Sequence, residues 1–119
     1  GVHLGLAGTG AADRAGCLLL QIGSAAPSFG KQAIARWQWN SLGFVKSGRK
    51  IQVYLGHDSA QPEIQIELSQ AQADDLNMAD LFFGGRSDNA SNWEGRLDEI
   101  AIFNKALSTQ QVQSLVRNP

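Results

Sequence analysis

Two alternating runs decide the fold of this chain: Trp39-Asn40-Ser41-Leu42-Gly43-Phe44-Val45-Lys46 and, after Ser47-Gly48, Arg49-Lys50-Ile51-Gln52-Val53-Tyr54-Leu55. Successive side chains of a β-strand point to opposite faces, so Ile51, Val53 and Leu55 share one face. Gly48 permits the positive φ that a tight turn requires. The stretch therefore predicts a β-hairpin.

Further extended segments lie on both sides of the hairpin. Val2 to Leu6 is a candidate strand, and Cys17 to Ile22 is a continuous apolar run. At that length the run favours a strand covered on both faces, with a buried helical segment as the alternative. Glu63 to Leu68 alternates strictly, which predicts isoleucines facing a core and carboxylates facing water.

The remaining segments are less regular. We expect loops at 7–16, 23–30 and 86–92, a short helical turn within 69–79, and another extended stretch from Trp93 to Phe103. Ile100 and Ile102 would share one face of that stretch.

A helix is predicted at the end of the chain. Ser108 is a suitable N-cap residue, and Gln111 three positions later completes a capping box. Leu107 can pack on Val112 as a hydrophobic staple. We expect Val112, Leu115 and Val116 to form one apolar stripe on this helix.

Composition limits the fold and the partners. The 119 residues suit a single domain spanning 1–119, and the hydrophobic content of 43% favours a globular chain over a disordered one. Ten basic and eleven acidic residues give a net charge of −1, which disfavours nucleic acid as a partner. No apolar run reaches the roughly 18 residues of a membrane span.

The single cysteine, Cys17, excludes an internal disulfide and is interpreted as a small buried hydrophobic residue. Short strands separated by turns indicate a β-sandwich or barrel.

The end of the chain resembles a known family. Its closing segment reads Gly95-Arg96-Leu97-Asp98-Glu99-Ile100-Ala101-Ile102-Phe103-Asn104-Lys105-Ala106-Leu107-Ser108. This segment, together with the hairpin, resembles the laminin-G-like, concanavalin A-like jelly-roll domains. The resemblance covers roughly residues 37–117 and implies an all-β, antiparallel β-sandwich with a short C-terminal helix. It also implies that Trp39 lies in the core, and Trp37 with it if the strand is continuous.

The chain departs from the family pattern in two places. Gly56-His57-Asp58 stands where the family has Asp-Gly or Asn-Gly, and the opening strands of the jelly roll have no clear match. Either the fold is abbreviated, or the missing strands lie in a lost segment or in another protein chain. An incomplete sandwich would leave a sheet face or edge exposed.

Catalysis is not expected. Glucanases of the same sandwich fold carry the motif Glu-x-Asp-x-x-Glu on one strand, and its carboxylates serve as the acid and nucleophile of hydrolysis. Glu94, Asp98 and Glu99 have the wrong spacing, and the pair Glu63 and Glu67 lacks the central aspartate. His3 and His57 lie in no recognisable catalytic or zinc motif. A sandwich-fold glycoside hydrolase therefore remains the least favoured alternative.

A sugar site combines an aromatic platform with planar polar groups. Trp93 lies beside a polar loop, and we take Trp93, Arg86, Asn92 and Asn89 as candidate ligand-binding residues. The alternative for Trp93 is that it caps the edge of the sandwich.

Calcium is the cofactor to consider, because it prefers carboxylate and carbonyl oxygens. Asp98 and Asp88 are the candidate metal ligands. The simpler interpretation makes Asp88 a turn former and Asp98 an acceptor for backbone amides of its own loop.

These observations predict a non-catalytic module that recognises a glycan or glycoprotein, in an extracellular or periplasmic location. The alternative is a structural or protein-interaction module of a larger extracellular or periplasmic assembly, in which another chain supplies the missing strands.

Overall fold

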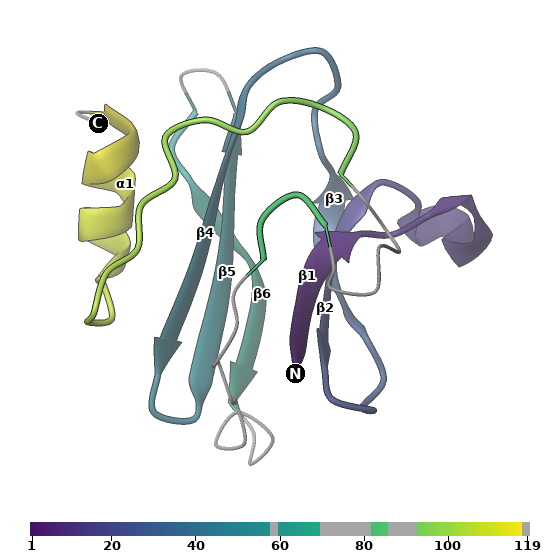
Figure 1. The fold of residues 1–119 in the computed structure, drawn as a ribbon, viewed down its shortest axis with the longest axis horizontal. Helices are drawn as coiled ribbons and strands as arrows, with labels where there is room; N and C mark the ends of the chain where they lie inside the picture. The colour runs from purple at the N-terminus through teal and green to yellow at the C-terminus, as the bar shows by residue number, and fades with distance from the viewer. Residues whose placement is uncertain (58–59, 70–81, 86–92, 118–119) are drawn as a thin grey trace.

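The computed structural model describes residues 1–57, 60–69, 82–85 and 93–117 (Figure 1). One antiparallel sheet has the order β1-β2-β3, with β1 at Val2–Leu6, β2 at Cys17–Ile22 and β3 at Ser28–Ala33. A second has the order β4-β5-β6, with β4 at Asn40–Ser47, β5 at Lys50–His57 and β6 at Glu63–Ser69. A 3₁₀ segment, η1, spans Thr9–Arg14, and the helix α1 spans Thr109–Arg117.

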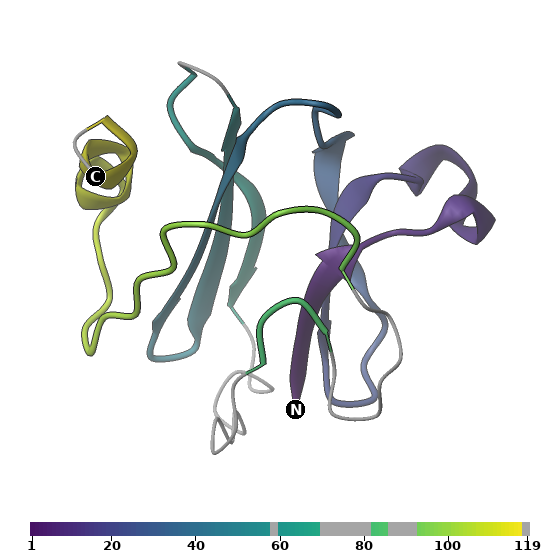
Figure 2. The same ribbon diagram turned by 45° about the horizontal axis from the view of Figure 1, so that its top comes forward.

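The elements form three layers, with the β4-β5-β6 sheet in the middle (Figures 1 and 2). On one face, Ile51, Val53 and Leu55 of β5 pack with Leu18 and Leu20 of β2. On the opposite face, the core continues through Val45, Tyr54 and Val112 of α1. The predicted antiparallel β-sandwich with a short C-terminal helix is confirmed, and β5 is buried from both sides.

The predicted hairpin is confirmed. Strands β4 and β5 pair in register from Ser47 with Lys50 to Asn40 with His57. Gly48 has a φ of +57°, which is the left-handed conformation that glycine adopts at little cost.

A β-bulge changes the expected alternation of β6. Val53 pairs with Ile66 and Tyr54 pairs with Ile64, so Gln65 is the extra residue. Ile66 therefore joins the core between the sheets, whereas Ile64 packs on the helix side. The prediction that both isoleucines of this strand face one core was wrong, because the bulge inverts the alternation at Gln65.

Gln65 connects the two sheets directly. Only 5% of the residue is exposed, and its Oε1 accepts a hydrogen bond of 3.0 Å from the backbone N–H of Lys31 in β3. A carbon atom added at Gly30 would lie 3.5 Å from the same oxygen. The amide of Gln65 thus satisfies a backbone donor of the neighbouring sheet.

The N-terminal third contains one correction. The strand predictions for Val2–Leu6 and Cys17–Ile22 are confirmed, and Cys17 is buried as expected. The predicted loop 23–30, however, already contains the start of β3 at Ser28. Strand β3 is stabilised by pairing with β2, for example Ser28 with Leu20, which the local sequence does not reveal.

A second correction concerns residues 93–107, which we call the strap. The strap crosses the molecule from the β1-β2-β3 side to α1 and forms no strand (Figures 1 and 2). Gly95 and Glu99 have φ values of +147° and +52°, which interrupt the expected extended run. Ile102 of the strap is 72% exposed.

Helix α1 begins as predicted but faces the sheet differently. The Ser108 N–H donates to Gln111 Oε1 at 2.9 Å, and the Gln111 N–H donates to Ser108 Oγ at 3.2 Å, which confirms the capping box. The face on the sheet runs through Thr109, Val112 and Gln113, whose Nε2 donates to the Pro62 carbonyl. Leu115 and Val116 are exposed, so the predicted apolar stripe was wrong beyond Val112.

Candidate functional site

The tryptophans are the most unusual feature of the surface. The chain has three, and their exposed fractions are 99% for Trp37, 59% for Trp39 and 39% for Trp93. The expectation that Trp37 and Trp39 lie in the core was wrong, because β4 begins only at Asn40 and its alternation does not extend back to them. Indoles are large apolar groups that folding normally buries.

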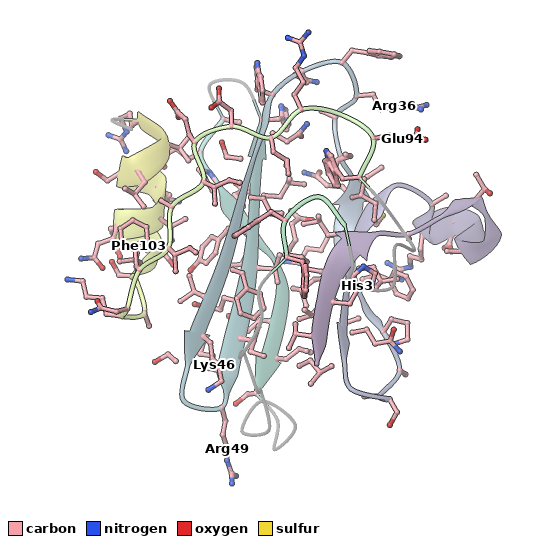
Figure 3. All side chains as sticks on the ribbon, in the orientation of Figure 1. His3, Arg36, Lys46, Arg49, Glu94 and Phe103 are labelled. Atoms are coloured by element: carbon pink, nitrogen blue, oxygen red, sulfur yellow. The ribbon has the colours of Figure 1, made fainter. Side chains whose placement is uncertain are left out.

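Trp37 lies in a turn between β3 and β4. Its φ of +63° is left-handed, a conformation that costs a residue with a Cβ about 1–2 kcal/mol. Figure 3 shows Arg36 of the same turn at one end of the molecule, and Lys46 and Arg49 at the other.

The side chain of Asn40 connects this turn to the sheet by hydrogen bonds. Asn40 Nδ2 donates to the carbonyl oxygens of Ala35, at 2.7 Å, and Gln38, at 3.0 Å. Asn40 is itself the first residue of β4 and pairs with His57 of β5. The two indoles are therefore presented on a backbone that the sheet holds in place.

Trp93, the platform predicted from the sequence, is held differently. Its backbone N–H donates to the Gly84 carbonyl at 2.7 Å. A carbon added at Gly95 would lie 3.0 Å from the indole Nε1, so the ring rests against Gly95. The predicted polar neighbours Arg86, Asn89 and Asn92 lie outside the described residues.

Of the two candidate calcium ligands, the structure describes only Asp98. Asp98 Oδ1 accepts a hydrogen bond of 2.9 Å from the N–H of Glu99, and Asp88 lies outside the described residues. Calcium requires about six to eight oxygen ligands. In the part of the chain that the structure describes, no three His, Cys, Asp or Glu side chains gather. The Asp98 contact matches the simpler interpretation of that residue as a turn-stabilising acceptor.

Two of the described residues that could act as acid or base, His3 and Glu67, lie on different sheets. His3 lies against Gly5 on β1, whereas Glu67 on β6 accepts a hydrogen bond from Gln52. An open depression of about 300 Å³ lies between the strap and α1, near Phe103 in Figure 3. It is lined by Phe103, Lys105, Leu107, Gln111, Ser114 and Leu115, a set without a carboxylate or an imidazole.

The sequence match agrees with this architecture. A laminin G family model, described as the concanavalin A-like lectin/glucanases superfamily, matches residues 24–113, well over half of the chain. The chain belongs to this superfamily. No curated protein and no solved structure matches it at a significant level. No helix among the described residues is long and apolar enough to cross a membrane.

The sequence-based interpretation favoured the core for Trp37 and Trp39 and did not predict an exposed turn between β3 and β4. A signal was present in Arg36-Trp37-Gln38-Trp39-Asn40, where two indoles alternate with polar side chains. The same alternation also suits the beginning of a strand, and the family resemblance favoured that interpretation. The structure separates the two interpretations through the positive φ of Trp37.

Proposed function

We propose that this chain is a non-catalytic recognition module that binds a glycan or glycoprotein outside the cytoplasm. The observation that supports the proposal is that none of the three tryptophans lies in the core. An exposed indole offers the flat apolar surface on which the C–H face of a pyranose ring stacks, while nearby polar groups bind its hydroxyls. Membership of a superfamily that contains lectins is compatible with this chemistry.

The extracellular or periplasmic location is part of the same proposal. Laminin G-like domains are typically extracellular. The only cysteine, Cys17, is buried in β2, and a buried thiol tolerates an oxidising compartment.

The direct test is an array of oligosaccharides built from glucose, galactose, mannose and N-acetylglucosamine. We expect the purified chain to bind a subset of them, and a soluble form of each hit to shift its tryptophan emission to shorter wavelength. If the chain binds no member of this array, and no acidic or sulfated glycan on an array extended to those classes, the glycan proposal is wrong.

A second candidate function is assembly with another protein chain. The strap carries large apolar side chains that are about half exposed or more: Leu97, Ile100, Ile102 and Phe103. Leu42 is also exposed on β4, which is an edge strand in the described structure. Apolar surface next to a strand edge favours pairing with a further strand.

Native mass spectrometry distinguishes this second function. Under the assembly hypothesis the chain recovered from its source should carry a stoichiometric partner, and replacing Ile102 by Asp should release it. A monomer with full glycan binding would favour the recognition module alone.

A further inference from the structure

The indole of Trp37 contributes little to the stability of the fold, and another residue would suit this position better. It is 99% exposed, so it contributes almost no buried apolar surface. Its left-handed backbone is one that glycine adopts freely and a residue with a Cβ adopts at a cost. Strain at an exposed side chain with no packing in return points to a role beyond stability.

The turn around Trp37 is held by hydrogen bonds from the Asn40 side chain. Asn40 holds the carbonyl oxygens on both sides of Trp37, those of Ala35 and Gln38, and is anchored in β4. A platform held in its binding conformation loses less conformational entropy when a ligand arrives. The second indole, Trp39, is more than half exposed and directly precedes Asn40 in the chain.

The composition of the turn suits a sugar better than an apolar protein surface. The exposed guanidinium of Arg36 precedes the first indole, and the two indoles are separated by a polar residue. Stacking surfaces interspersed with planar polar groups match a pyranose, which has apolar C–H faces and a rim of hydroxyls. Protein interfaces instead centre on a contiguous apolar core.

We propose that the β3–β4 turn, residues 35–39, is the carbohydrate-binding site, with Trp37 as the main stacking platform and Trp39 as the second. This inference rests on the proposed function and moves its site away from Trp93. Trp93 is the least exposed of the three indoles, and its ring already lies against Gly95.

The test compares three variants of the full chain, Trp37→Gly, Trp39→Ala and Trp93→Ala, against an oligosaccharide that the array identifies. We expect Trp37→Gly to weaken binding by roughly tenfold or more and Trp39→Ala to weaken it less. The control Trp93→Ala should bind as the original chain does. Trp37→Gly should melt at the same temperature or higher, because the turn loses its strain.

The possible results separate the two proposals. If Trp93→Ala abolishes binding and Trp37→Gly does not, the site inference is wrong while the recognition function stands. A marked drop in the melting temperature of Trp37→Gly would show that the indole serves folding, and would also overturn the inference. If the unmodified chain binds no oligosaccharide, both proposals fail.

Discussion

The hydroxyl of Tyr54, at the centre of β5, lies 2.8 Å from Oγ1 of Thr109 in the first turn of α1. Tyr54 directs its own hydrogen to Gln52 Oε1 at 3.2 Å, so Thr109 is the donor in this pair. Gln52 Nε2 in turn donates to Glu67 Oε2 at 2.8 Å. One chain of hydrogen bonds therefore connects the helix to β5 and β6.

Removing the hydroxyl of Tyr54 should weaken this connection. We expect Tyr54→Phe to lower the free energy of unfolding by about 1 kcal/mol, because the ring still fills its buried site while the hydrogen bonds are lost. Urea titration measures the change. Thr109→Val provides the partner variant, and the double variant should cost less than the sum of the two. Strictly additive costs would show that the pair is not coupled.

The capping box of α1 should be measurable in the same way. Ser108→Ala removes the acceptor of the Gln111 N–H and should cost about 1 kcal/mol. Ser114→Ala, at an exposed position of the same helix, is the matched control and should be neutral or slightly stabilising. Equal effects of the two substitutions on thermal unfolding would contradict a capping role.

Gly56 is expected to tolerate no side chain. A Cβ at this position would lie 3.0 Å from both the Ala60 carbonyl oxygen and the Pro62 nitrogen, which are backbone atoms that cannot rotate away. Gly56→Ala should therefore destabilise the chain by about 1–3 kcal/mol in a denaturant titration.

The control for Gly56 is Gly8→Ala. Gly8 has an extended backbone and nothing within 4 Å of the added carbon, so this variant should be neutral or slightly more stable. A Gly56→Ala variant as stable as Gly8→Ala would mean that the approach of Pro62 is not required by the fold.

The role of Asp98 can be separated from calcium binding. Its contact with the Glu99 N–H predicts that an excess of chelator leaves the melting temperature unchanged. Asp98→Asn retains an acceptor oxygen and should preserve stability, whereas Asp98→Ala should cost at most about 1 kcal/mol. A melting temperature that falls with chelator in the original chain, but not in Asp98→Asn, would establish Asp98 as a metal ligand.

The sequence predicts the parts of this fold that local interactions determine. The hairpin around Gly48 and the cap at Ser108 depend on residues within a few positions of each other, and both predictions are confirmed. The bulge at Gln65 depends instead on a backbone donor in another sheet, at Lys31. The periodicity of the β6 sequence contains no information about a hydrogen-bond donor 34 residues away in the chain.

The candidate site was predicted less well for a related reason. Whether the indole of Trp39 is buried depends on where strand β4 begins. The alternation of polar and apolar residues in the sequence is the same whether Trp39 lies inside the strand or before it. The family resemblance placed Trp39 in the core, and its exposure of 59% corrects that placement. The identity of the superfamily, in contrast, was predictable, because the closing segment lies within the matched residues 24–113.

The central position of β5 has a consequence for the order in which the chain comes apart. Strand β5 is hydrogen-bonded along both edges, to β4 and β6, and covered on both faces. The helix or the outer sheet can detach while β5 keeps both neighbours, so partial openings leave its amides protected. Deuterium should therefore enter the backbone at Val53 and Tyr54 only when the whole molecule opens, and their exchange rates provide a direct measure of global stability.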